Sequence, residues 1–233
     1  MPTVLFLPGL DGEVFSMAKI AEHTPGVRLE HFAYPVGSRP DWELLTRQVA
    51  ARMQRLGTRL LAGESFGGAL AQKTALLHRD TVGSLFLLST FTREPEAFAA
   101  ALGRAAARHL PGFLMRPVAR LLAGWKLAGT LQGDDRRKFL DRFARLDFAD
   151  LAARLELLRG FDTRGALAGL NLPLAVLCGA RDPISANEAQ LQAWRALPDC
   201  RLHVLPGLGH LAAAEAPAQT GALLADWARQ HGA

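Results

Sequence analysis

Short, apolar, β-rich runs alternate along most of this chain with longer segments of helical periodicity, and this alternation restricts the fold more than any other feature. Such a pattern is typical of βα units whose strands form a parallel sheet with helices on both faces. The expected strands are Val4–Leu7, Val27–Phe32, Arg59–Ala62, Ser84–Leu88, Leu174–Cys178 and Arg201–Leu205. The expected helices are Val14–Glu22, Trp42–Leu56, Gly67–His78, Ala189–Leu197 and Ala216–Gln230. We therefore predict an α/β fold with about six mainly parallel strands.

The alternation stops between Thr92 and Gly169, a stretch rich in Ala, Leu and Arg that contains no convincing strand. A segment of this length with its own helices is an insertion and not a loop. We expect three to five helices here, above the strand ends where open α/β sheets bind ligands. Residues 1–91 and 170–233 then form the core, and residues 92–169 form a helical cap inserted in it.

The sequence GESFG, Gly63–Gly67, lies where the third expected strand gives way to a helix. A serine on a sharp strand-to-helix turn has a strained backbone, so the residues two before and two after it must lack colliding side chains. Gly63 and Gly67 occupy these positions. The pattern also arises by chance, and a tight turn is the alternative reading. We interpret Ser65 as a nucleophile, provided that a base and an acid lie nearby.

Two later loops supply residues of the required types in the order Ser, Asp, His. Asp182 follows the strand Leu174–Cys178, and His210 follows the strand Arg201–Leu205. The predicted roles are those of a base, His210, that is oriented by an acid, Asp182. Taken singly, each is equally an ordinary loop residue. Glu94, after the fourth expected strand, is the alternative acid.

Attack of a hydroxyl on an ester builds negative charge on the carbonyl oxygen, so N–H donors must already point at that oxygen. The amide of Phe66 is one expected donor, because it lies at the start of a helix where unpaired amides collect. The loop after the first strand, PGLDG, supplies the second. We predict the amide of Leu10, with Asp11 as the alternative; the same loop is also an ordinary Pro/Gly turn.

These residues resemble the motifs of the α/β-hydrolase superfamily, and the resemblance covers nearly the whole chain except the details of the insertion. Pro8-Gly9 stands where several members carry His-Gly, and the FLPGLDG form resembles a subgroup of hydrolases and acyltransferase-like proteins that act on lipid or acyl esters. We expect a sheet of about six strands that lacks the two leading strands common in the family. The chain also has a general likeness to the esterases that demethylate a pimeloyl carrier-protein ester.

The resemblance and the residues together predict a serine esterase that needs neither a metal nor an organic cofactor. The expected substrate is a small-molecule carboxylic ester or thioester with a small to medium apolar acyl group, cleaved through an acyl-enzyme. Acyl transfer to an alcohol by the same three residues is the alternative. A third hypothesis is a ligand-binding protein that keeps the fold without turnover.

Composition narrows the class of partners. The formal net charge is +5, but like charges form no long block and aromatic residues do not alternate with the arginines, which argues against nucleic acid. The segment Leu110–Gly129 mixes apolar residues with Arg116, Arg120 and Lys126. It is either a cap helix with a solvated basic face or an amphipathic surface for an acidic carrier protein or a membrane.

The remaining features predict an intracellular, cytoplasmic protein. No apolar run is long enough to span a bilayer, and the first residues lack the pattern of a signal peptide. Cys178 and Cys200 have no metal-ligand spacing, and we expect buried structural thiols.

Overall fold

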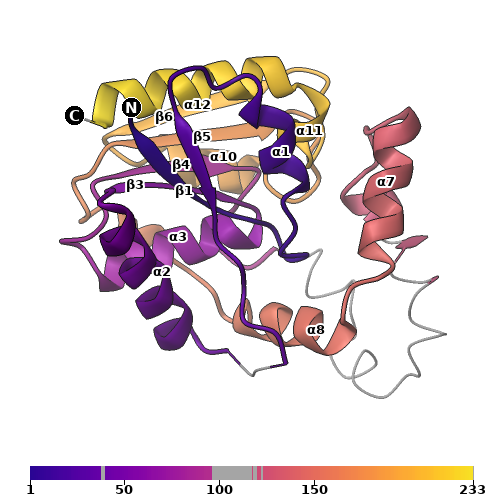
Figure 1. The fold of residues 1–233 in the computed structure, drawn as a ribbon, viewed down its shortest axis with the longest axis horizontal. Coiled ribbons are helices and arrows are strands. Elements are labelled where there is room, and N and C mark those ends of the chain that lie inside the picture. Colours follow the sequence, from indigo (N-terminus) through magenta and orange to yellow (C-terminus); the bar gives the residue numbers. More distant parts are fainter. Residues whose placement is uncertain (38–39, 96–116, 118–119, 122, 233) are drawn as a thin grey trace.

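The computed structural model describes residues 1–37, 40–95, 117, 120–121 and 123–232, and its centre is a six-stranded sheet (Figure 1). The strands are β1 (Thr3–Leu7), β2 (Arg28–His31), β3 (Leu60–Glu64), β4 (Ser84–Leu88), β5 (Leu174–Gly179) and β6 (Cys200–Leu205). Their order is β2-β1-β3-β4-β5-β6, and every neighbouring pair is parallel. The predicted α/β fold with about six strands is confirmed.

Helices cover both faces of this sheet (Figure 1). On one face lie α1 (Phe15–Ala21), α11 (Ala212–Glu215) and α12 (Pro217–His231); on the other lie α2 (Trp42–Leu56), α3 (Phe66–Leu77) and α10 (Glu188–Arg195). Successive residues of a strand point to opposite faces. Accordingly, Val4 and Phe6 belong to the core between the sheet and α12, whereas Leu5 and Leu7 belong to the core between the sheet and the helices α2 and α3.

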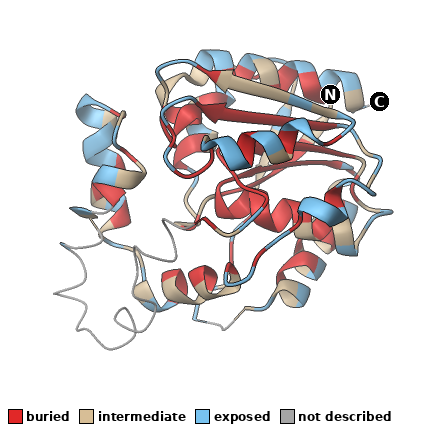
Figure 2. Ribbon diagram, turned by 180° about the vertical axis from the view of Figure 1, so that it is seen from behind, coloured by how far each residue is buried: buried red, intermediate tan, exposed pale blue. Residues whose placement is uncertain are grey.

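Burial explains why these runs are strands and helices. All residues of β3, β4 and β5 are buried, as expected for parallel strands covered on both sides (Figure 2). Helix α2 has the predicted bounds because local signals fix both ends. The side chain of Asp41 accepts the Leu44 N–H at 2.7 Å, and Gly57 ends the helix with φ +63°.

The described residues between β4 and β5, in the range that we expected to be a cap, include α7 (Gly133–Phe143), α8 (Phe148–Leu157) and α9 (Arg164–Leu167). Figure 1 shows α7 and α8 on the side of the sheet where β1 ends. Residues 96–116, including Arg116 and part of the segment Leu110–Gly129, lie outside the described residues. The division into core and cap therefore stays a prediction.

Candidate active site

The turn between β3 and α3 holds Ser65 in a conformation that side chains rarely adopt, with φ +53°. A side chain at Gly63 would collide with the carbonyl group of Gly67, and one at Gly67 would collide with the carbonyl oxygen of Leu7. Glycine is therefore required at both positions. The Ser65 amide donates to the carbonyl oxygen of Leu88 at 2.9 Å, which fixes the turn to the end of β4.

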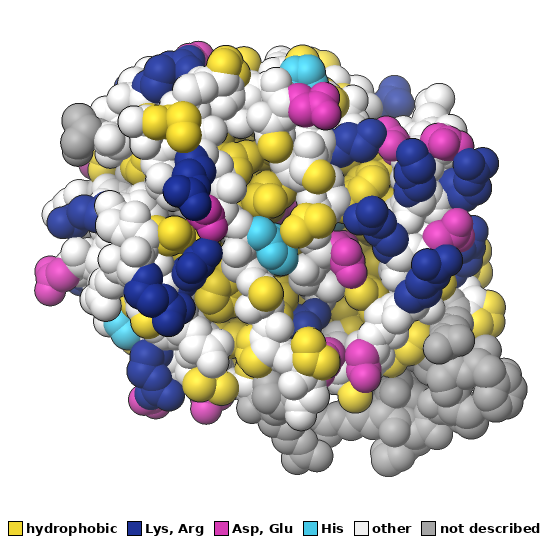
Figure 3. All heavy atoms as spheres, in the orientation of Figure 1, with side chains coloured by type: hydrophobic (Ala, Val, Ile, Leu, Met, Phe, Trp, Pro, Cys, Tyr) yellow, Lys and Arg dark blue, Asp and Glu magenta, His cyan; other side chains and the backbone are white. Residues whose placement is uncertain are grey.

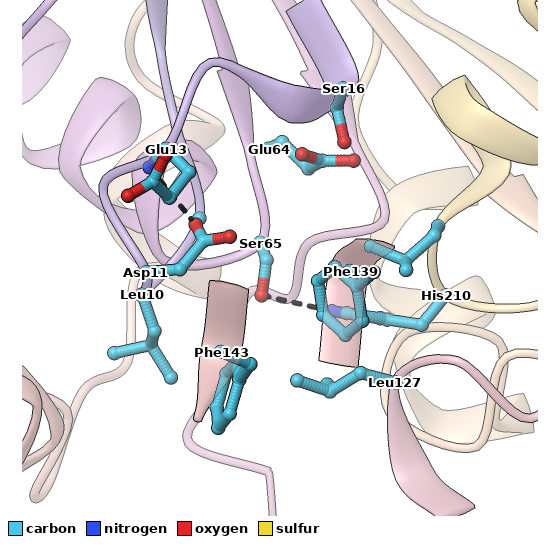
Figure 4. Close-up of a pocket in the computed structure, with 12 residues that line it drawn as sticks. Leu10, Asp11, Glu13, Ser16, Glu64, Ser65, Leu127, Phe139, Phe143 and His210 are labelled. Atoms are coloured by element: carbon cyan, nitrogen blue, oxygen red, sulfur yellow. Dashed lines mark hydrogen bonds between the residues drawn. The ribbon is translucent and has the colours of Figure 1, made fainter. Parts of the chain in front are cut away.

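The loops after β5 and β6 bring Asp182 and His210 to this turn. Nε2 of His210 lies 3.0 Å from Oγ of Ser65 (Figure 4), and Nδ1 lies 2.8 Å from Oδ2 of Asp182. The carboxylate of Asp182 also accepts the Ile184 amide at 2.8 Å and the hydroxyl of Ser185. These contacts hold the imidazole so that one nitrogen faces the serine and the other faces the acid. His210 thus lies within hydrogen-bonding distance of both Ser65 and Asp182, the two other residues predicted from separate loops.

The pKa of His210 is raised above its ordinary value of 6.5 by its surroundings. Burial alone opposes a charge on His210, but its pKa is raised because the Asp182 carboxylate lies against it, with smaller contributions from Glu64 and Glu215. Burial likewise opposes a charge on Asp182, and here the His210 ring and the Ser185 hydroxyl lower the pKa of the carboxyl. A pair of this kind stabilises the imidazolium that forms when histidine takes a proton.

The alternative acid, Glu94, has a different contact in the structure. Its Oε2 accepts the Gly160 amide at 2.8 Å, and Nδ1 of His210 contacts Asp182 instead.

The loop that follows β1 lies beside the serine, as the oxyanion prediction requires. A side chain at Gly9 would place its Cβ 4.0 Å from Cβ of Ser65. Within the described part of the chain, the amides of Leu10 and Phe66 donate to no protein acceptor. Donation from these amides, or from Asp11, stays a prediction.

Three successive carbonyl groups of this loop are each held by a donor. The bonds run from Tyr34 Oη to Pro8 (2.6 Å), from Gly12 N to Gly9 (3.0 Å) and from Arg154 Nη1 to Leu10 (2.7 Å). The amide that we expect to contact the oxyanion belongs to the peptide between Gly9 and Leu10, so the bonds fix it from both sides. Arg154 comes from α8, is 7% exposed and lies with its guanidinium 4.8 Å from the centre of the Tyr34 ring.

A small pocket of about 30 Å³, partly open to solvent, lies over Ser65 (Figure 4). One wall is acidic and comes from the β1 loop, α1 and the end of β3; the opposite wall is apolar and comes from α7 and the segment before it. The acidic wall contains Asp11, Glu13, Ser16 and Glu64, and the apolar wall contains Leu127, Phe139 and Phe143. Helix α7 and the segment before it therefore shape the space next to the serine.

Sequence reasoning did not identify Glu64, Tyr34 and Arg154 as parts of this site. Glu64 stands next to the serine within GESFG, so its position gave a usable signal. Tyr34 and Arg154 lie far from any motif, and only the folded chain shows their contacts with the β1 loop.

Among the described residues, no set of three or more His, Cys, Asp or Glu side chains is arranged to hold a metal ion. None of the helices in the described ranges has the length and apolar character needed to cross a membrane.

Comparison with known proteins shows the family. The chain is 31% identical over 230 residues to a pimeloyl-[acyl-carrier protein] methyl ester esterase of Chromobacterium violaceum, covering 90% of this chain and 87% of that protein. Its fold is similar to that of a thermophilic esterase from Thermogutta terrifontis, with a TM-score of 0.79, 22% identity and coverage of 100% and 91%. An enol-lactonase from Burkholderia xenovorans LB400 gives a TM-score of 0.81 at 20% identity, with coverage of 97% and 90%. The model of the alpha/beta hydrolase family matches residues 4–223, and the chain belongs to that family.

Proposed function

We propose that this α/β-hydrolase is a serine esterase in which Ser65 is the nucleophile, His210 the general base and Asp182 the residue that orients the imidazole. The observation that carries the proposal is the continuous contact from serine through imidazole to carboxylate, at 3.0 and 2.8 Å, on a strained turn. This arrangement is the one that activates a hydroxyl, which is a weak nucleophile on its own.

The reaction proceeds in two halves. His210 takes the proton of Ser65 as the serine oxygen attacks the ester carbonyl, and the amides of Leu10 and Phe66 stabilise the oxyanion, each by about 3 kcal/mol. The imidazolium then protonates the departing alcohol, which leaves an acyl group on Ser65. A water molecule, deprotonated by the same imidazole, releases the acid and restores the serine.

The apolar wall formed by Leu127, Phe139 and Phe143 supports an ester with an apolar acyl group of small to medium size.

A p-nitrophenyl ester series from acetate to octanoate, measured on wild type and Ser65→Ala, tests the proposal. The expected result is an optimum at short or medium length in the wild type and loss of turnover in the variant. Equal, slow hydrolysis by both proteins at every length would reject the esterase function. Repeating the series with an added acceptor alcohol, with analysis of the products, separates hydrolysis from acyl transfer.

An acidic carrier protein is a second candidate for what presents the ester. The curated relative is named for a methyl ester on an acyl-carrier protein. Here, exposed Arg137, Lys138 and Arg142 lie on α7, whose Phe139 and Phe143 line the pocket, and basic side chains gather with acidic ones over this helix (Figure 3). If a carrier protein docks there, KM for a carrier-bound methyl ester is lower than KM for the free ester, and it rises with salt concentration. Equal KM values for the two esters reject the carrier protein as a partner.

A further inference from the structure

Glu64, the residue directly before Ser65, carries a buried carboxyl with an unpartnered oxygen. Its side chain is 6% exposed, and Oε1 has no hydrogen-bond partner among the described residues. Figure 4 shows the carboxyl beside Ser16, above Ser65 in this view, where both residues line the pocket. A buried polar group without a partner costs about 1–3 kcal/mol, and more when it is charged. Such a group next to a nucleophile suggests that a bound ligand donates the missing hydrogen bond.

The surrounding charges do not supply the missing partner. Glu13 lies 3.9 Å from Arg142, and Asp11 lies near Arg154, but no ion pair involves Glu64 in the described part of the chain. Burial raises the pKa of Glu64 to about 7 and that of Asp11 to about 6. The same residues are not arranged as a metal site within the described ranges. A hydrogen bond from the Ser16 side chain lowers the pKa of Glu64, but Oε1 of Glu64 has no donor among the described residues.

The position of Glu64 relative to His210 indicates which part of an ester meets the acidic wall. The two side chains are close enough that each shifts the pKa of the other. In the proposed reaction His210 gives its proton to the departing alcohol, so the alcohol lies near the imidazole. An apolar acyl group then packs against Phe139 and Phe143 on the opposite wall.

We propose that Glu64, together with Asp11 and Ser16, forms a subsite for a hydroxyl or protonated amine carried by the alcohol part of the substrate. The subsite rests on the proposed ester hydrolysis and names its substrate class: esters of polyols or amino alcohols. A bound donor completes the bonding of the Glu64 carboxyl and, when charged, offsets its repulsion of the oxyanion. A methyl ester carries no such donor and leaves the carboxyl unpartnered.

Two pairs of butyrate esters with matched shapes test the subsite. In the first, 2-hydroxyethyl butyrate is compared with propyl butyrate; in the second, 2-(dimethylamino)ethyl butyrate is compared with 3-methylbutyl butyrate. In each pair an apolar carbon replaces the donor group. The wild type is expected to prefer at least one donor ester by about tenfold or more in kcat/KM, measured by titration of the released acid. The pair that shows the preference identifies whether the donor is a hydroxyl or an amine.

Variants of Glu64 connect the preference to this residue. Glu64→Gln removes the charge and keeps an acceptor, so it abolishes an amine preference and retains part of a hydroxyl preference. Glu64→Met abolishes both. Glu22→Gln, an exposed carboxyl at the end of α1, is the matched control and keeps the wild-type ratios. Thermal melting checks that each variant is folded. If Glu64→Met does not fold, Glu64→Gln decides, because its donor preference must be smaller than that of the wild type.

The outcomes separate the two proposals. If the wild type hydrolyses all four esters without preferring a donor, the subsite is wrong and the esterase proposal stands. A donor preference that survives in both Glu64 variants also overturns the subsite. If none of the four esters is hydrolysed and a fluorophosphonate does not label Ser65, the proposed function itself fails.

Discussion

Replacing Arg154 with methionine tests whether the inserted helix α8 holds the oxyanion loop in place. The guanidinium donates to the carbonyl oxygen of Leu10 at 2.7 Å, and methionine fills similar volume without this bond. A hydrogen bond to a charged group contributes about 1.5–3 kcal/mol. An oxyanion donor contributes about 3 kcal/mol, and a loop that loses one of its three anchors loses part of that stabilisation.

We therefore expect kcat of Arg154→Met to fall about tenfold to a hundredfold, which corresponds to about 1.4–2.7 kcal/mol, while KM changes by less than about threefold. The assay is p-nitrophenyl butyrate hydrolysis, combined with the affinity for a trifluoromethyl ketone that forms a tetrahedral adduct on serine. Affinity for the ketone should fall in parallel with kcat, because both depend on the oxyanion donors.

Two further variants separate positioning from stability. Arg154→Lys keeps a positive donor and should recover part of kcat. Arg159→Met removes an exposed arginine that lies just after α8 and pairs with Glu156. This variant should behave like the wild type. If Arg154→Met keeps the wild-type kcat and ketone affinity while its melting temperature falls, Arg154 stabilises the fold only and the reasoning is wrong.

Three other predictions concern pH and the tight turn. In the pH profile of kcat/KM, the midpoint of the acid limb should lie above the ordinary histidine pKa of about 6.5. Glu64→Gln should move this midpoint to lower pH, because Glu64 helps to raise the pKa of His210. An unchanged midpoint in the variant contradicts this coupling. The wild type should lose up to about 3 kcal/mol of stability relative to Glu64→Gln as the pH rises from about 4.5 to 7. The reason is that the pKa of Glu64 is raised to about 7 in the folded state, so the folded protein keeps this proton to higher pH than the unfolded chain. An equal difference in unfolding free energy between the two proteins at both ends of this pH range would contradict the prediction. Gly67→Ala should abolish soluble, active protein, because its Cβ would collide with the carbonyl oxygens of Leu7 and Pro8, and a stable, active variant would show that the turn has more room than the structure gives it.

Much of the fold follows from local patterns in the sequence. The six strands are predicted to within two residues at each end, and β3, β4 and β5 read as largely apolar runs because they are buried on both faces. Helix α2 has the predicted bounds because Asp41 and Gly57 mark its ends. The order of the strands in the sheet, with β1 between β2 and β3, depends on long-range packing and does not follow from any local pattern.

The candidate site divides in the same way. Ser65, Asp182 and His210 lie in loops at strand ends, where a short motif and the order of the strands are enough to nominate them. Arg154 reaches the β1 loop from 144 residues away, and nothing near it in the sequence distinguishes it from the other arginines. Glu64 was visible in the motif, but its unpartnered oxygen depends on which side chains pack around it.

The central claim is that Ser65 is a nucleophile activated by His210, and covalent labelling tests it most directly. Cleavage after Arg59 and Lys73 gives the peptide LLAGESFGGALAQK, in which Ser65 is the only hydroxyl side chain. After treatment with a fluorophosphonate, mass spectrometry should find one adduct per chain, on this peptide, with labelling lost in Ser65→Ala and strongly slowed in His210→Gln. A wild-type protein that remains unlabelled, or that is labelled equally fast without His210, would contradict the account.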